Sequence, residues 1–245
     1  MKIGIIIQAR MGSSRFPGKI LEKINNISLL ELQYRRLVNS KKANKIIVAT
    51  SDKSIDNSIE ELCIELGILC FRGSEDNVLD RYYQAAKAHD IDTIIRSNGD
   101  CPFIDPAEVD KLIEIWEFNY PNYDYISNIL EETFPLGMHI EIFKIASIKK
   151  ALNENLSKED LEHVTPYLYR NPEKFNLLSV RNEEDLSKYR WTIDYPEDLK
   201  FVEEIYKRFG TNNSSFGMKD IIKLLNKEPE LININSKYKK KQNLL

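Results

Sequence analysis

The chain has 245 residues, of which 42% are hydrophobic and 30% are charged, and its formal net charge is -3. This apolar content suffices for a sizeable core and excludes a disordered, collagen-like or low-complexity chain. The charge gives no basic excess for duplex nucleic acid or an anionic membrane surface, so we expect neither partner. The three cysteines form no C-x-x-C pair, and every apolar run falls short of the roughly 18 residues of a membrane span, so the expected location is the cytoplasm.

Short apolar, β-branched runs alternate with amphipathic stretches through the first half of the chain. We expect buried strands at residues 3–7, 45–49, 68–71 and 93–96, and helices at residues 29–38, 55–66, 78–88 and from 106 onward. Ile55, Ile59, Leu62, Cys63 and Leu66 would share the buried face of the second helix. Continuous apolar strands separated by helices predict an α/β fold with a parallel sheet covered on both faces.

The fourth of these helices opens with strong signals. Asp105 is its expected N-cap, because Pro106 occupies the first turn and Glu108 follows three residues after the cap.

The alternation loosens in the second half. We expect strands at residues 123–127, 139–143, 177–180 and 191–194, and helices at residues 158–170, 196–209 and 218–225. Pro166 predicts an irregular start or a kink in the first of these helices. Residues 1–209 would form a single domain and residues 210–245 a C-terminal helix and a polar tail. The tail lysines are interpreted as a solvated end rather than a nucleic-acid-binding arm: Lys237, Lys239, Lys240 and Lys241.

The segment of residues 8–21, QARMGSSRFPGKIL, follows the first expected strand directly. In doubly wound sheets, ligands bind at the carboxyl ends of strands. The segment combines small residues, which let backbone N–H groups approach an anion, with three cations: Ala9, Gly12, Ser13 and Ser14, and Arg10, Arg15 and Lys19. Composition alone also fits an ordinary basic surface loop. The position after the first strand favours a cradle for a nucleoside triphosphate, although neither the Walker nor the dinucleotide fingerprint is present.

This run resembles the opening motif of the cytidylyltransferase family that includes the spore-coat polysaccharide SpsF proteins. It is more distantly similar to the enzymes that activate sialic acids and Kdo as CMP-sugars. Further matching motifs extend the resemblance over roughly residues 1–209: ATSD at 49–52, FRGSEDNVLDRYYQAAK at 71–87, GDCPFIDP at 99–106, EHVTPY at 162–167 and RWTIDYPED at 190–198. The resemblance implies a Rossmann-like, mostly parallel sheet of the nucleotide-diphospho-sugar transferase type. It also implies a Mg²⁺-dependent nucleotidyltransferase that releases pyrophosphate.

Two aspartates are the candidate ligands of Mg²⁺. Asp100 follows the fourth expected strand, and Asp194 ends the strand expected at residues 191–194. Mg²⁺ is typically held by one or two carboxylates together with phosphates and water. The resemblance equates Asp100 with the family's metal-binding aspartate and Asp194 with its late partner. For Asp194 a helix-capping role stays open, because Tyr195 stands where the family often has a cap-forming threonine.

Other candidates follow the second and third strands at the same sheet edge. Ser51 and Asp52 fit contacts to the base or ribose, or equally an ordinary helix cap. Arg72 and Ser74 could reach the base or ribose, and the resemblance favours nucleotide or substrate contact for both. The expected nucleotide contacts are Gln8, Ala9, Arg10, Gly12, Ser13, Arg15, Lys19, Ser51, Asp52, Arg72, Ser74 and Asp100. Among them, Arg10, Arg15 and Lys19 are expected to serve catalysis by binding the phosphates.

The acceptor would bind in the looser portion at roughly residues 120–190, to Glu141, His163 and Thr165, although a structural role for His163 is equally open. Three histidines without paired spacing make a zinc site an unfavoured interpretation. The sequence thus predicts an enzyme that transfers CMP from CTP to a sugar acid, sugar phosphate or other small phosphorylated acceptor in surface glycan biosynthesis. GTP or UTP as donor, or a non-catalytic nucleotide- or sugar-binding protein, are the alternatives, and a homodimer is compatible with dimerising relatives.

Overall fold

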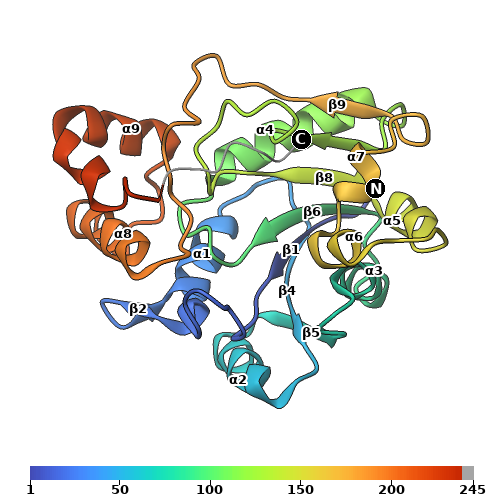
Figure 1. Ribbon diagram of the computed structural model, residues 1–245, viewed down its shortest axis with the longest axis horizontal. Helices are drawn as coiled ribbons and strands as arrows, with labels where there is room; N and C mark the ends of the chain where they lie inside the picture. Colours follow the sequence, from blue (N-terminus) through green and yellow to red (C-terminus); the bar gives the residue numbers. More distant parts are fainter. Residues whose placement is uncertain (239–245) are drawn as a thin grey trace.

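A seven-stranded sheet forms the centre of the molecule in the computed structural model, which describes residues 1–238 (Figure 1). Its strand order is β5-β4-β1-β6-β8-β7-β9. The strands are β1 (Ile3–Gln8), β4 (Lys45–Ser51), β5 (Leu69–Gly73), β6 (Thr93–Asn98), β7 (Tyr125–Ser127), β8 (Glu141–Lys144) and β9 (Leu177–Ser179). β1 pairs in parallel with β4 and β6, and β4 with β5, whereas β8 runs antiparallel to β6 and β7. The predicted mostly parallel sheet is confirmed.

Helices cover both faces of the sheet because successive side chains of a strand point to opposite sides. Ile3, Ile5 and Ile7 of β1 join one apolar cluster, and Ile6 joins another. The first cluster is covered by α1 (Leu29–Leu37), α2 (Asn57–Leu66) and α4 (Pro106–Asn119). The second is covered by α3 (Val78–Ala88), α5 (Ile145–Ala151) and α7 (Pro166–Tyr169).

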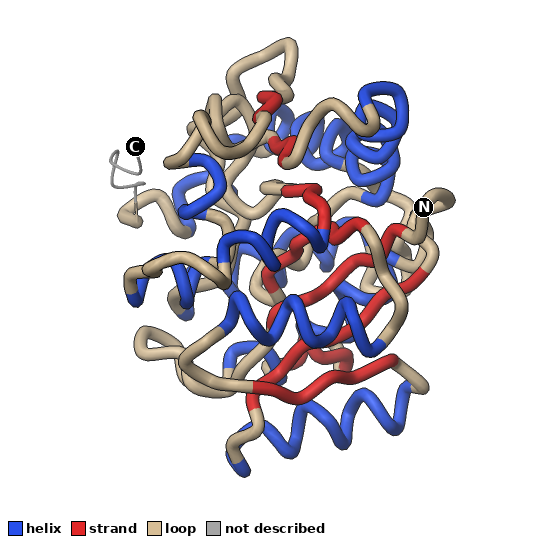
Figure 2. Tube along the Cα trace, turned by 90° about the vertical axis from the view of Figure 1, so that its right-hand side faces the viewer, coloured by secondary structure: helices blue, strands red, loops and turns tan. Residues whose placement is uncertain are grey.

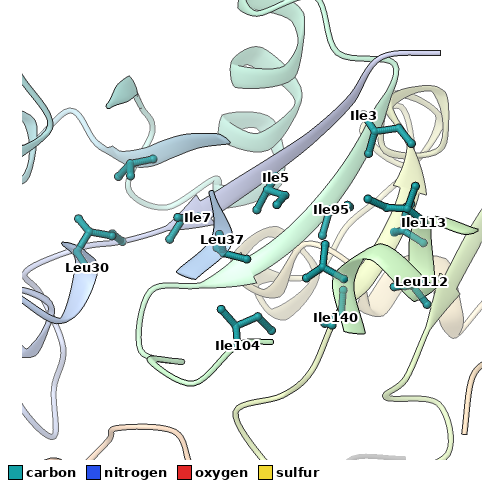
Figure 3. Close-up of a cluster of buried hydrophobic side chains, with 14 of the residues drawn as sticks. Ile3, Ile5, Ile7, Leu30, Leu37, Ile95, Ile104, Leu112, Ile113 and Ile140 are labelled. Carbon is teal, nitrogen blue, oxygen red and sulfur yellow. The ribbon is translucent and has the colours of Figure 1, made fainter. Parts of the chain in front are cut away.

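Two views make these layers visible. Figure 3 shows Leu30 and Leu37 of α1, with Leu112 and Ile113 of α4, gathered around the isoleucines of β1 and Ile95 of β6. In the perpendicular view of Figure 2, the strands form a twisted layer with helices around it.

A third apolar cluster lies beside the sheet and joins segments that are far apart in sequence. It contains α8 (Pro196–Phe209), α9 (Met218–Lys227), the 3₁₀ helix η3 (Pro229–Ile234) and the hairpin of β2 (Lys23–Ile24) and β3 (Ile27–Ser28). Phe103, which follows β6, packs edge-on against Trp191 and Phe201, with ring centroids 6.3 Å apart in both pairs. α8 and α9 therefore flank the carboxyl ends of β1 and β6 (Figure 1).

Most predicted elements are present, and the Asp105 cap is confirmed, since its side chain accepts the N–H of Ala107 at 2.9 Å. The strand predicted at residues 191–194 is wrong within the described chain. Trp191 N–H donates to the carbonyl of Leu136 at 2.7 Å, and Ile193 N–H to that of Asp100 at 2.9 Å, so the segment bonds to loops and not to a strand of the sheet.

Two helices also differ from their predictions. The helix expected at residues 158–170 is divided into α6 (Lys158–His163) and α7, because Val164 adopts a positive φ of 73° ahead of Pro166. Ile55 is 59% exposed, not buried, because Ser54–Asp56 form the separate 3₁₀ turn η2 before α2 begins. The short elements β2, β3, α5 and η3 were not predicted.

No helix within residues 1–238 is both long and apolar enough to cross a membrane. The predicted tail residues Lys239, Lys240 and Lys241 lie outside the described residues.

Candidate active site

The loop after β1 is folded back on itself by its own backbone. Ser13 N–H and Gly18 N–H both donate to the carbonyl of Met11, at 2.9 and 3.0 Å, and Met11 N–H donates to Asp56 Oδ1 at 2.7 Å. Gly18 takes a left-handed φ of 75°, which a residue with a side chain rarely adopts, and starts the 3₁₀ turn η1 (Lys19–Leu21). This turn directs Lys19 back toward the carboxyl ends of the strands.

The Lys19 side chain lies between two aspartates from distant parts of the chain. Its ammonium group donates to Asp100 Oδ2 at 2.7 Å and to Asp194 Oδ1 at 3.1 Å, and it also bonds the carbonyl of Ile193. The side chain is only 8% exposed. Burial lowers the pKa of Lys19, but the two carboxylates outweigh it and the net pKa is raised, so the ammonium is charged at neutral pH. The two candidate metal ligands, Asp100 and Asp194, therefore both contact the ammonium group of Lys19.

Asp194 is held by three cations. Besides Lys19, Arg15 Nη2 donates to Oδ1 at 2.7 Å and Arg190 Nη2 to Oδ2 at 2.9 Å. Burial raises the pKa of Asp194, but Lys19, Arg190 and Arg15 lower it by more, so the carboxyl is ionised. At the start of α8 it is Asp198 that accepts the N–H groups of Asp194 and Tyr195, at 2.9 and 3.0 Å. The side chain of Asp194 thus points toward the cations, and the capping alternative is wrong.

These groups lie in a cleft of about 450 Å³ at the carboxyl ends of β1 and β6. Its lining residues are Gln8, Arg10, Ser13, Ser14, Arg15, Lys19, Ile20, Arg96, Asn98, Gly99, Asp100, Leu136, Glu162, His163, Thr192 and Asp194. The opening loop, the end of β6 and three later segments therefore converge on one site, as expected for a ligand at the strand ends of an α/β sheet.

Six of the predicted nucleotide contacts line this cleft: Gln8, Arg10, Ser13, Arg15, Lys19 and Asp100. The other six do not, among the residues that the structure describes: Ala9, Gly12, Ser51, Asp52, Arg72 and Ser74.

Most of that second set contacts other protein groups. Arg72 donates to the carbonyls of Ser51 and Lys53 and to the side chains of Asn57 and Glu60. Ser51 donates its hydroxyl hydrogen to Asp56. In a further turn, Ser74 Oγ accepts the N–H of Asn77 at 3.0 Å. These contacts shape the loops after β4 and β5.

On the predicted acceptor side, His163 lines the cleft and Glu141 and Thr165 are buried away from it. Glu141 accepts hydrogen bonds from Arg96 Nη1 and, at 2.8 Å, from the hydroxyl of Tyr125. Arg96 is the member of this ion pair that reaches the cleft. Sequence reasoning missed Arg96 and Asn98, although both end the strand that precedes Gly99 and that pairs with β1.

The donor set suits Mg²⁺. Within residues 1–238, no three His, Cys, Asp or Glu side chains are grouped as a metal site. Asp100 and Asp194 nevertheless supply two carboxylates on one cleft, and Mg²⁺ prefers such oxygen ligands while keeping waters and substrate phosphates. Asp100 is the less engaged of the two, because Lys19 and a long contact of 3.5 Å from the Cys101 thiol are its side-chain partners.

Comparisons with known proteins agree with this geometry. Residues 4–226 match the sequence model of the cytidylyltransferase family. The chain is 35% identical over 233 residues to the spore coat polysaccharide biosynthesis protein SpsF of Bacillus subtilis, covering 92% of this chain and 94% of that protein. It is 32% identical over 244 residues to the 3-deoxy-manno-octulosonate cytidylyltransferase of Chlamydia trachomatis, covering 83% and 93%.

A solved structure of a cytidylyltransferase from Leptospira borgpetersenii has the same fold, with a TM-score of 0.90 and 36% identity over 100% of this chain and 99% of that chain. The family match spans most of the chain, and these relatives are matched over most of their length. The resemblance expected from the opening loop is therefore confirmed, and the chain belongs to the cytidylyltransferase family of nucleotidyltransferases.

Proposed function

We propose that this enzyme transfers CMP from CTP to a small anionic or phosphorylated acceptor in the presence of Mg²⁺, with release of pyrophosphate. The observation that carries the proposal is the buried Lys19 between Asp100 and Asp194, in a cleft that Arg10 and Arg15 also line. A nucleoside triphosphate carries about four negative charges, which guanidinium and ammonium groups neutralise through charge-assisted hydrogen bonds.

The cations have partners that a triphosphate would replace. Arg10 Nη2 donates to Glu162 Oε1 at 3.1 Å and Arg15 to Asp194, and both arginine side chains are partly exposed. Arg10, Arg15 and Lys19 would bind the phosphates, and Gly12 would contribute a backbone N–H group. Ala9 and Ser13 stay proposed contacts, but their N–H groups now donate to the carbonyls of Ala49 and Met11 and would have to exchange these partners. Electrostatic stabilisation and positioning of this kind supply much of the rate of phosphoryl transfer.

Mg²⁺ would be held by Asp100 together with Asp194, and it would neutralise charge on the α and leaving phosphates. The acceptor oxygen would form a new bond to the α-phosphorus as the bond to the leaving pyrophosphate oxygen breaks. A phosphate acceptor would attack as its anion, and a hydroxyl acceptor would release its proton to water.

Base and ribose contacts would come from the end of β1 and the loops after β4 and β5. Gln8 lines the cleft, and its buried amide oxygen accepts no hydrogen bond from residues 1–238, so a substrate N–H or O–H fits there. Ser51, Asp52, Arg72 and Ser74 stay proposed contacts of the nucleotide. Those that now bond protein groups would have to exchange these partners.

The acceptor would lie on the side of Arg96 and His163, within the portion predicted at residues 120–190 and the adjoining end of β6. Thr165 and Glu141 would support this side from behind. The relation to SpsF and to a 3-deoxy-manno-octulosonate cytidylyltransferase supports a sugar acid or sugar phosphate of surface glycan biosynthesis as acceptor.

The test is pyrophosphate release with each of the four nucleoside triphosphates, Mg²⁺ and a panel of sugar acids and sugar phosphates. We expect turnover with CTP. Asp100→Asn and Lys19→Met should each lower kcat by about 100-fold or more, because each removes a group aimed at the reacting phosphates.

The exposed Lys23 and Asp76 supply matched controls, Lys23→Met and Asp76→Asn, which should keep normal turnover. Near-normal turnover of either site variant, or pyrophosphate release with no triphosphate of the panel, would refute the proposal.

A further inference from the structure

The orientation of Asp194 depends on a buried ion pair behind it. Arg190 donates from Nε and Nη2 to the two carboxylate oxygens of Asp198, at 2.9 and 3.0 Å, and the same Nη2 reaches Asp194 Oδ2 at 2.9 Å. The Asp198 side chain is fully buried. Because Asp198 also accepts the backbone N–H groups of Asp194 and Tyr195, it fixes Asp194 through both main chain and side chain.

The last described residues contact this ion pair of Arg190 and Asp198. We call residues 229–238 the C-terminal clasp. Its Asn235 is 4% exposed, and Nδ2 donates to Asp198 Oδ1 at 2.9 Å and to the carbonyl of Arg190 at 3.1 Å. A single amide group therefore bonds both members of the ion pair that holds Asp194.

A second contact of the clasp reaches the residue next to Asp194. The Tyr238 ring stacks on the Tyr195 ring with centroids 3.7 Å apart and planes 3° apart. Tyr238 also donates its hydroxyl hydrogen to Glu197 at 2.8 Å. The guanidinium carbon of Arg15 lies 5.5 Å from the centre of the Tyr195 ring, which is within cation–π range. Tyr195 thus connects the clasp with Arg15 of the loop after β1.

The clasp lies after the last residue of the family match, which ends at 226. Its apolar side chains, such as the buried Leu231, pack with α8 and α9 and explain why the segment docks there. Apolar docking does not require the hydrogen bonds of Asn235. These bonds go to Arg190 and Asp198, which are the two residues that orient Asp194.

We propose that the C-terminal clasp is a positioning element of the active site. Asn235 fixes the Asp198–Arg190 pair and hence the carboxylate of Asp194, and Tyr238 fixes Tyr195 beside Arg15. The kinetic consequence rests on the proposed function, because it assigns Asp194 to the metal and Arg15 to the phosphates. Displacing a reacting group by about 1 Å can cost about 100-fold in rate.

The kinetic test compares the full chain with Asn235→Ala. We expect kcat for CTP-dependent pyrophosphate release to fall by about 10-fold or more and the half-saturating Mg²⁺ concentration to rise. The KM of the acceptor should stay unchanged, because the His163 side of the cleft has no contact with Asn235. Asn233→Ala, an exposed asparagine of the same segment, is the matched control and should behave as the wild type.

Hydrogen exchange tests the clasp without any turnover. The N–H groups of Asp194 and Tyr195 should exchange faster in Asn235→Ala and in the surface variant Tyr238→Leu, but not in Asn233→Ala. If the wild type releases no pyrophosphate, the proposed function fails while this readout still tests the clasp. If Asn235→Ala does not fold, Tyr238→Leu is the test. Unchanged exchange at residues 194–195 in the folded variants, or an unchanged kcat in an active enzyme, would overturn the inference.

Discussion

Glu141 and Arg96 form an ion pair on the proposed acceptor side of the cleft. Both were within reach of sequence analysis, yet only Glu141 was predicted to contact the acceptor. The antiparallel register of β6 and β8 sets Arg96 opposite Glu141 and turns the carboxylate into the interior, where it is 3% exposed. Directly opposite residues of two paired strands project from the same face of the sheet. The pairing of Glu141 with Arg96 therefore depends on this register, which the sequence of one strand does not contain.

Glu141→Gln would leave Arg96, whose side chain is only 13% exposed, without its counter-charge. We expect the free energy of unfolding to fall by about 3 kcal/mol, as found when one partner of a buried pair is removed, and Tm to drop by several degrees. Thermal unfolding measures the change. Glu162→Gln is the comparison, since Glu162 is 48% exposed and its pair with Arg10 should contribute less than about 1 kcal/mol. Equal Tm losses in both variants would contradict this view of Glu141.

The elements themselves were predicted unevenly, for reasons that the packing explains. β1, β4 and β6 are buried on both faces, and α3 and α8 present one apolar stripe, so their patterns are unambiguous. Trp191 and Ile193 in residues 191–194 are as deeply buried as strand residues, but the backbone of this segment bonds to loops around Gly137 and Asp100. A local apolar pattern does not distinguish burial within a sheet from burial under loops. Asp194 therefore reaches the site from a loop and not, as was predicted, from the end of a strand.

Gly137 is where that loop packing leaves no room. Its φ is +104°, and a Cβ there would lie 2.7 Å from the backbone nitrogen of Thr192 and 2.8 Å from the carbonyl carbon of Trp191. Gly137→Ala should therefore destabilise the protein by more than the roughly 1–2 kcal/mol of a positive φ alone, and it should lower turnover by displacing the segment that carries Asp194.

Gly67→Ala is the control for this substitution, because Gly67 also has a positive φ but an added Cβ would meet no atom within 4 Å. Urea unfolding of both variants gives the difference. A loss for Gly67→Ala as large as that for Gly137→Ala would be evidence against the clash.

At the scale of the whole molecule, the sequence predicted the sheet and its two covered faces but not the third apolar cluster. That cluster joins the β2–β3 hairpin to α8, α9 and the clasp, and such contacts between distant segments leave no periodic signal. The same limit applies to the site. Arg10, Arg15, Lys19, Asp100 and Asp194 were recognisable from motifs, and their convergence is observed. The support by Asp198 and Asn235 depends on three-dimensional packing.

The clasp is attached at its outer end by a pH-sensitive carboxylate. Hydrogen bonds from Lys237 and Tyr238 lower the pKa of Glu197 from 4.5 to about 2. A folded-state pKa below the unfolded value means that this attachment stabilises the protein above about pH 4.5 and is lost as the pH falls toward 2. The wild type should exceed Glu197→Gln in Tm at pH 7, and the gap should narrow at pH 3. A Tm difference between the two proteins that is absent at pH 7, or that does not change with pH, would contradict the role given to the Glu197 carboxylate.

The position of Lys19 determines how the fold should respond when divalent ions are removed. Since an internal ammonium already offsets the two acids that face it, the native state does not rely on a divalent ion to hold them together. Chelation by EDTA should stop catalysis yet leave the melting temperature where it was, and a marked drop on chelation would mean that the ion is a structural brace. Under the proposed function, Mg²⁺ would then bind together with the substrate and would not be needed for folding.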